Sequence, residues 1–127
     1  MCKGKKLRLS TLGHTWILDI DGTIVKHNGY KINGKDSFLP GAKEFLLNIP
    51  EKDMVILLTS RTEDYRQETE AFLRKNNIRY DHLLCGAPLG ERILINDDKP
   101  SGLPMSFGIR TVRDCWAGIS VEEDSSL

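Results

Sequence analysis

Carboxylates and hydroxyls gather where three separate apolar runs of the sequence stop. The residues concerned are Asp19 and Asp21 at the end of 15–20, Thr59 and Ser60 after 54–58, and Asp97 and Asp98 after 92–96. Carboxylates that converge repel one another unless a cation lies between them, and oxygen ligands without nearby His or Cys suit Mg²⁺. Such an ion can orient a phosphoryl group while one carboxylate attacks phosphorus and a second exchanges protons. The predicted chemistry is phosphoryl transfer.

The apolar runs before these polar residues have the length and composition of buried strands. We expect strands at 15–20, 54–58 and 92–96, a further strand at 107–112 and a weaker one at 80–84. Helices are expected at 42–49, just after Pro40, and at 62–76. Strands that alternate with helices and are apolar on both faces predict a parallel sheet with helices on both faces. The fold class is α/β, a single Rossmann-like domain with its ligand site at the C-terminal edge of the sheet.

The composition fits one ordinary domain over 1–127, with loose ends at about 1–12 and 120–127. Lys and Arg number 18 and balance 18 Asp and Glu, which argues against a dedicated nucleic-acid binder. No apolar run approaches the roughly 20 residues that span a bilayer, and no signal core follows the basic start. Three cysteines form no C-x-x-C pair. We therefore expect a cytoplasmic protein without a membrane partner.

Residues 19–23 read D-I-D-G-T and match D-x-D-G-T, the first motif of the haloacid dehalogenase (HAD) superfamily. The stretch 57–61, L-L-T-S-R, resembles the second motif, a strand that ends in Thr or Ser. The stretch 94–98, L-I-N-D-D, resembles the acidic fourth motif. All three occur in the family's order on predicted strands. The chain resembles small HAD phosphatases that lack a cap domain, such as the capsule-biosynthesis phosphatase-like members.

The resemblance implies a role for each motif residue. Asp19 resembles the nucleophile and Asp21 the general acid and base. The implied ligands of Mg²⁺ are Asp19, Asp21 and Asp97, with Asp98 as an alternate. The implied phosphate-binding residues are Thr59, Ser60, Gly22 and Arg92. Taken alone, Thr59 and Ser60 also suit the cap of the helix at 62–76.

One motif departs from the family's pattern. Related phosphatases carry Gly-Lys-Pro before the acidic strand, where this chain has Gly86-Ala87-Pro88. Arg92 and Lys99 are the nearest cations that could replace the lysine, and we favour Arg92. Arg61 and Arg113 each follow a predicted strand and are candidate substrate contacts, with a solvated arginine as the equal alternative. Without a cation at the site, turnover would be poor.

The intervals 23–59 and 59–97 must hold the predicted helices and strands, so neither has room for a cap domain. The stretch 25–38 contains Asn33-Gly34 and predicts a small β-hairpin flap. An open site needs a large substrate or a second subunit as a roof, so a homo-oligomer is one way to cover it. The flap residues that would lie in such a contact, or pack on the chain's own core, are Tyr30, Ile32 and Phe38.

The sequence thus predicts a Mg²⁺-dependent phosphomonoester hydrolase that works through an aspartyl-phosphate. A phosphorylated sugar or sugar acid is the substrate that the resemblance implies. A phosphatase on nucleotide or polynucleotide ends is the alternative enzyme, which an open site permits and the neutral charge disfavours. A catalytically weak phosphate-binding protein on the same fold is a further alternative, because of Ala87. A signalling receiver domain is disfavoured, since the central strand ends in Thr59-Ser60 with no phospho-accepting Asp.

Overall fold

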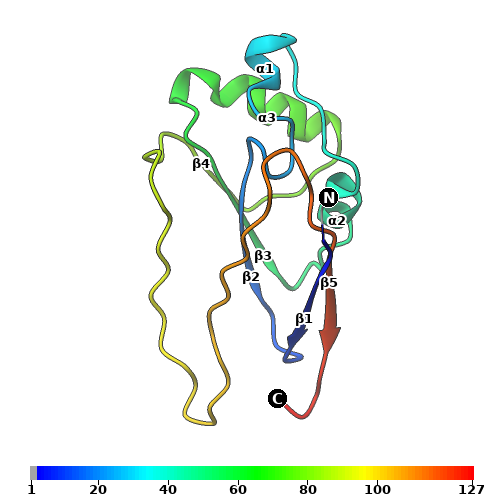
Figure 1. Ribbon diagram of the computed structural model, residues 1–127, viewed down its shortest axis with the longest axis vertical. Coiled ribbons are helices and arrows are strands. Elements are labelled where there is room, and N and C mark those ends of the chain that lie inside the picture. Colours follow the sequence, from blue (N-terminus) through cyan, green and yellow to red (C-terminus); the bar gives the residue numbers. More distant parts are fainter. Residues whose placement is uncertain (1–2) are drawn as a thin grey trace.

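The computed structural model describes residues 3–127 and contains a sheet of three parallel strands (Figure 1). They are β2 (Thr15–Asp19), β3 (Met54–Leu58) and β4 (His82–Leu84), in the spatial order β2-β3-β4. The register pairs Asp19 with Leu58 and Leu58 with Leu84, so the three strands end together at one edge. The α/β class and the strands expected at 15–20, 54–58 and 80–84 are confirmed.

Helical segments connect these strands. They are α1 (Gly29–Ile32), α2 (Ala42–Leu47), the 3₁₀ turn η1 (Glu63–Tyr65) and α3 (Arg66–Lys75). Leu46 of α2 and Leu73 of α3 belong to one buried cluster with Leu57 of β3. On the opposite face of the sheet, Ile17 and Leu84 are 51% and 49% exposed. Helices were expected on both faces, but they cover only the face that carries Leu57 and leave this one partly exposed. No helix among residues 3–127 is long and apolar enough to cross a membrane.

The two terminal segments, which the sequence predicts to be loose, pair with each other. β1 (Lys5–Leu9) and β5 (Ile119–Glu123) form a parallel two-stranded sheet with Lys5 opposite Ile119. Lys6 Nζ lies 2.7 Å from Glu122 Oε2, and Arg8 forms a further ion pair with Asp124. Each exposed pair contributes little energy, but the basic start and the acidic finish attract each other in this register. The backbone ladder between β1 and β5, with these ion pairs across it, joins the two ends, so they are not separate solvated tails.

The segment 91–112 differs most from the expectation. Strands expected at 92–96 and 107–112 are not formed, and the chain instead runs out and back as two extended arms (Figure 1). Ile93 and Ile95 are 82% and 91% exposed. An apolar run becomes a strand only by pairing with another strand. Here the outer edge of β2 has no partner strand among the described residues, and the arm at 92–96 does not pair with it.

The flap at 25–38 is a helical loop and not the expected β-hairpin. An isolated bridge joins Val25 to Phe38, and α1 occupies the tip between them. Asn28 takes a left-handed conformation with φ of 55° at the start of α1, which turns the chain into the helix. The rings of Tyr30 and Tyr65 meet edge to face at 5.0 Å between centroids, and Phe38 stacks on Phe72 at 4.8 Å. These two flap residues therefore pack on the chain itself, while Ile32 is 68% exposed.

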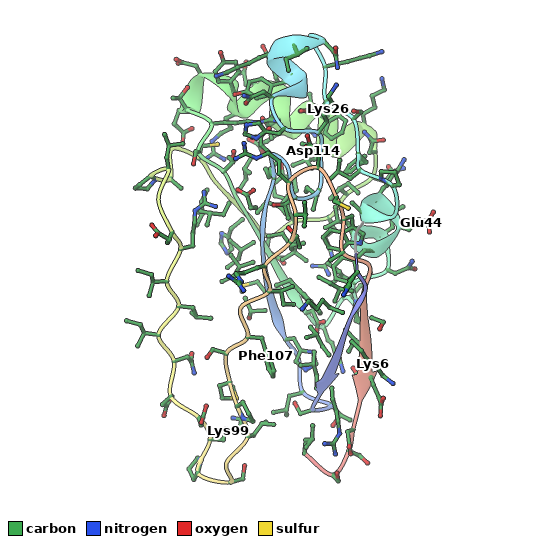
Figure 2. All side chains as sticks on the ribbon, in the orientation of Figure 1. Lys6, Lys26, Glu44, Lys99, Phe107 and Asp114 are labelled. Atoms are coloured by element: carbon green, nitrogen blue, oxygen red, sulfur yellow. The ribbon has the colours of Figure 1, made fainter. Side chains whose placement is uncertain are left out.

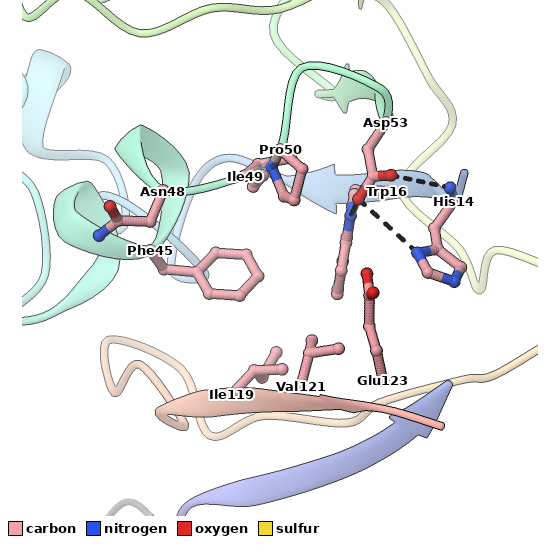
Figure 3. Close-up of a pocket in the computed structure, with 10 residues that line it drawn as sticks. All are labelled: His14, Trp16, Phe45, Asn48, Ile49, Pro50, Asp53, Ile119, Val121 and Glu123. Atoms are coloured by element: carbon pink, nitrogen blue, oxygen red, sulfur yellow. Dashed lines mark hydrogen bonds and ion pairs between the residues drawn. The ribbon is translucent and has the colours of Figure 1, made fainter. Parts of the chain in front are cut away.

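A cavity of about 370 Å³ separates β5 from β2 and α2 (Figure 3). Trp16 and Phe45 meet in it edge to face, with ring centroids 5.3 Å apart. Asp53 is 4% exposed, and its carboxylate accepts hydrogen bonds from His14 N at 2.9 Å and from Trp16 Nε1 at 3.0 Å. Burial works against ionisation of this carboxyl, but the two hydrogen bonds, together with charge interactions that include Lys52, outweigh it and lower the pKa of Asp53. This carboxylate fixes the start of β2.

We expect Asp53→Asn to lower the free energy of unfolding by about 1–3 kcal/mol at neutral pH, because a buried charged acceptor with two donors is lost. The pKa of Asp53 is lower in the folded state than the usual value near 3.9 in an unfolded chain. Its stabilising effect is therefore fully present above about pH 5 and is lost as the pH falls through the folded-state pKa. Denaturant unfolding of both proteins at pH 7 and pH 3 checks this. An equal difference at the two pH values would contradict it.

Candidate active site

The first acidic motif forms a tight turn at the end of β2. The main-chain amides of Thr23 and Ile24 both donate to the carbonyl oxygen of Ile20, at 3.2 and 3.0 Å. Gly22 has a φ of 81°, and a Cβ added there would lie 3.1 Å from Arg113 Cγ, so the position requires glycine. The turn places the carboxylates of Asp19 and Asp21 together at the C-terminal edge of the sheet.

A cavity of about 300 Å³ opens at this edge. Two acids and four cations contribute to its wall together with Ser60: Asp19, Asp21, Lys31, Arg61, Arg92 and Arg113. The structure thus brings together most of the site residues expected from sequence. Thr59 lies beneath them and is 1% exposed, and its hydroxyl accepts a hydrogen bond from Arg61 N at 3.0 Å. The helical segments that follow begin at Glu63 and Arg66 and have Thr62 and Tyr65 at their caps, so Thr59 closes the turn after β3 and does not cap a helix.

The Asp19 carboxylate is accessible and held in one orientation. Its Oδ2 accepts a hydrogen bond from Thr23 Oγ1 at 2.9 Å, and its Oδ1 lies 3.1 Å from Arg92 Nη1. Arg92 Nη2 also donates to Ser60 Oγ at 3.3 Å. The side chain of Asp19 is 31% exposed, so a ligand can reach it. An oriented, reachable carboxylate beside a guanidinium has the geometry for nucleophilic attack on an anionic group.

Arg92 and not Lys99 is the cation beside Asp19. Figure 2 shows Lys99 at the far end of the extended arms and Asp114 near the site. Asp114 N donates a hydrogen bond to the Gly22 carbonyl at 2.8 Å, so Asp114 lies beside the turn that carries Asp19 and Asp21. The segment that carries Gly86-Ala87-Pro88 therefore still delivers a cation to the site. That cation is Arg92, which lies five residues after Ala87, the position where the related motif has lysine.

Arg61 differs from its expected place as a substrate contact. It is 4% exposed, and its guanidinium forms a two-point ion pair with Asp21, with Nε–Oδ2 at 3.0 Å and Nη2–Oδ1 at 2.9 Å. Burial works against its charge, but hydrogen bonds to Asp21 and to Asp36 outweigh that effect and raise the pKa of Arg61. Arg61 therefore orients Asp21.

Asp97 does not join the other two expected metal ligands. Asp97 and Asp98 lie in the extended segment and are exposed, since the strand expected to deliver them is not formed. Among residues 3–127, no group of three or more His, Cys, Asp or Glu side chains is arranged to hold a metal ion. Asp19 and Asp21 line the same cavity, where Asp19 pairs with Arg92 and Asp21 with Arg61.

Sequence reasoning missed two residues of this site. Asp36 from the flap binds Arg61, and Tyr30 covers it, with the guanidinium carbon 4.0 Å from the ring centroid. Asp36 stands in a polar loop stretch, so no periodicity or motif marks it. The one usable signal was Arg61 itself. An arginine so close to the end of a buried strand needs buried acidic partners, which could have prompted a search for them.

Solved structures that resemble this chain include chains of one RNA repair complex. A chain of the Pnkp1/Rnl/Hen1 RNA repair complex is 32% identical, with a TM-score of 0.50, over 66% of this chain and 29% of that chain. A chain in a structure of the Pnkp1/Rnl/Hen1 complex is 31% identical, with a TM-score of 0.50, over 65% of this chain and 31% of that chain. This chain thus spans less than a third of the length of either. No protein-family model and no curated protein matches the sequence.

Proposed function

We propose that this chain is a phosphomonoesterase that removes a terminal phosphate from a polynucleotide, with RNA as the first substrate to test. The observation that carries the proposal is the accessible Asp19 carboxylate, held by Arg92 and Thr23 beside the Asp21–Arg61 pair. The likeness to chains of an RNA repair complex favours a polynucleotide end over the phosphorylated sugar that the sequence predicts first.

In the proposed reaction a carboxylate oxygen of Asp19 attacks phosphorus, and the bond from phosphorus to the ribose oxygen breaks. Asp21, when protonated, gives its proton to that oxygen, so the nucleic acid leaves as an alcohol. Water then attacks the phosphorus of the aspartyl-phosphate, and Asp21 accepts a proton from it. This step frees Asp19 and releases inorganic phosphate. Arg92 and Ser60 are placed to bind the phosphoryl oxygens during both steps.

Local charge supports a polynucleotide even though the net charge is zero. Lys31, Arg92 and Arg113 line the cavity, and none of them has the dense buried contacts of Arg61. Cations spaced around a phosphate site attract the neighbouring phosphodiesters of a nucleic acid. A single sugar phosphate would use fewer of them.

Mg²⁺ is the cofactor that we propose for this site. Asp19 and Asp21 offer the hard oxygen donors that Mg²⁺ prefers, and the ion would help to neutralise a phosphoryl group. The residues fit in part, since Asp97 lies outside the cavity, and the steps above therefore use protein groups alone.

The test is phosphate release from a short RNA with a 3′-phosphate, from the same RNA with a 5′-phosphate, and from glucose 6-phosphate. Each is measured with Mg²⁺ and with EDTA. We expect release from one of the RNA ends at a rate at least about tenfold above the sugar phosphate, because only the RNA can use the surrounding cations. Raising the salt concentration should reduce this preference. Release from the sugar phosphate alone would contradict the substrate class, and no release from any substrate would contradict the function.

A further inference from the structure

The flap residue Asp36 forms a two-point ion pair with Arg61. Its side chain is 6% exposed, with Oδ1 at 2.7 Å from Arg61 Nη2 and Oδ2 at 3.0 Å from Nη1. Charges are rarely buried to this extent unless a partner of opposite sign is fixed beside them. The contact joins the flap to the loop that follows β3.

Every N–H donor of the Arg61 guanidinium is used within the protein. Nε and one hydrogen of Nη2 go to Asp21, the other hydrogen of Nη2 and one of Nη1 go to Asp36, and the last goes to Thr69 Oγ1 at 2.9 Å. An arginine side chain has five such donors, so none remains for a substrate phosphate. Tyr30 covers one face of the guanidinium plane at 4.0 Å.

We infer that Asp36 is a positioning residue for the reaction, acting on Asp21 through Arg61; this inference rests on the proposed function. Arg61 binds two carboxylates with one rigid planar fork, so the position of one sets the position of the other. Asp36 and Thr69 fix the fork, and the fork fixes the Asp21 oxygen that exchanges a proton with the leaving group. Because Asp36 belongs to the flap, the flap must be seated for Asp21 to be aligned.

The experiment compares two leaving groups in Asp36→Asn and in wild type. On an RNA end the leaving group is a ribose alkoxide, a poor leaving group that needs a proton, whereas p-nitrophenyl phosphate releases p-nitrophenolate, which departs without one. We expect Asp36→Asn to lower kcat on the RNA end by about tenfold or more, with KM changed little, and to slow far less the first step with p-nitrophenyl phosphate, measured as the burst of p-nitrophenol. Asp64→Asn is the matched control, because Asp64 is an exposed acid of η1 outside the cavity wall.

A purely structural role for Asp36 predicts an equal loss on both substrates, and that result would overturn the inference. So would an unchanged kcat on the RNA end. If Asp36→Asn does not fold, Asp36→Glu decides, since it keeps the charge, moves the carboxylate by one methylene and should give the same split between substrates. Wild-type protein that releases no phosphate from either substrate would instead refute the proposed function.

Discussion

We expect Asp19→Asn to abolish phosphate release from every substrate. An amide cannot attack phosphorus to form the acyl-phosphate, so the covalent route is closed. The loss should be on the order of 10⁴-fold or more in kcat, as for other enzymes that lose their nucleophile. Initial rates with RNA ends and with p-nitrophenyl phosphate measure it, and acid-stable trapping of radiolabelled phosphate on the protein reports the missing intermediate.

The Asp19 variant should keep its fold, because the wild-type side chain is 31% exposed and the amide oxygen can still accept a bond from Thr23 or Arg92. Thermal unfolding therefore serves as its control. More than about one hundredth of wild-type activity in a folded Asp19→Asn protein would be too much for an enzyme without its nucleophile, and would assign the attack to another group.

Asp21→Asn should lower kcat by about 10²–10⁴-fold on an RNA end, the usual effect of losing general acid–base catalysis. Attack by Asp19 remains available, so a substrate with a good leaving group should still phosphorylate the protein. Hydrolysis of that intermediate also needs Asp21. We therefore expect p-nitrophenyl phosphate to give a burst of one equivalent of p-nitrophenol followed by slow turnover, which rapid mixing resolves.

Arg61→Lys tests whether Asp21 must be held in one orientation to act as acid and base. Lysine keeps the charge near Asp21 and Asp36 but cannot reproduce the planar two-point contacts. It should slow the RNA end, and with p-nitrophenyl phosphate it should give a burst as Asp21→Asn does, because both leave Asp19 free to attack. Wild-type rates on the RNA end in Asp21→Asn would contradict the assigned role of that carboxylate.

The local parts of the site follow from the sequence, and the distant pairings do not. The turn at 19–23 closes through hydrogen bonds between residues three to five apart, so D-x-D-G-T is enough to predict it. Arg61 is different, because its partners Asp21 and Asp36 lie 40 and 25 residues away. The position of Arg61 directly after β3 could be predicted, but the identity of its buried partners depends on how the flap folds back.

The same reason explains the errors at 92–96 and at the ends of the chain. Hydrophobicity marks 92–96 as able to form a strand, but a strand also needs a free neighbour in register, which no local pattern encodes. The terminal segments show the reverse case. Their charges predict solvation, yet β1 and β5 find each other across nearly the whole chain because their sequences are complementary in sign.

The pairing of β1 with β5 has a consequence for the order in which the protein folds. Arg8 and Asp124 are 116 residues apart, so closing this contact orders the longest loop in the chain and costs the most chain entropy. Its strands are mostly exposed and bury little apolar surface in return. The terminal sheet should therefore form last and open first, as a separate low-stability unit, while the turn that carries Asp19 and Asp21 stays folded around β2 and β3.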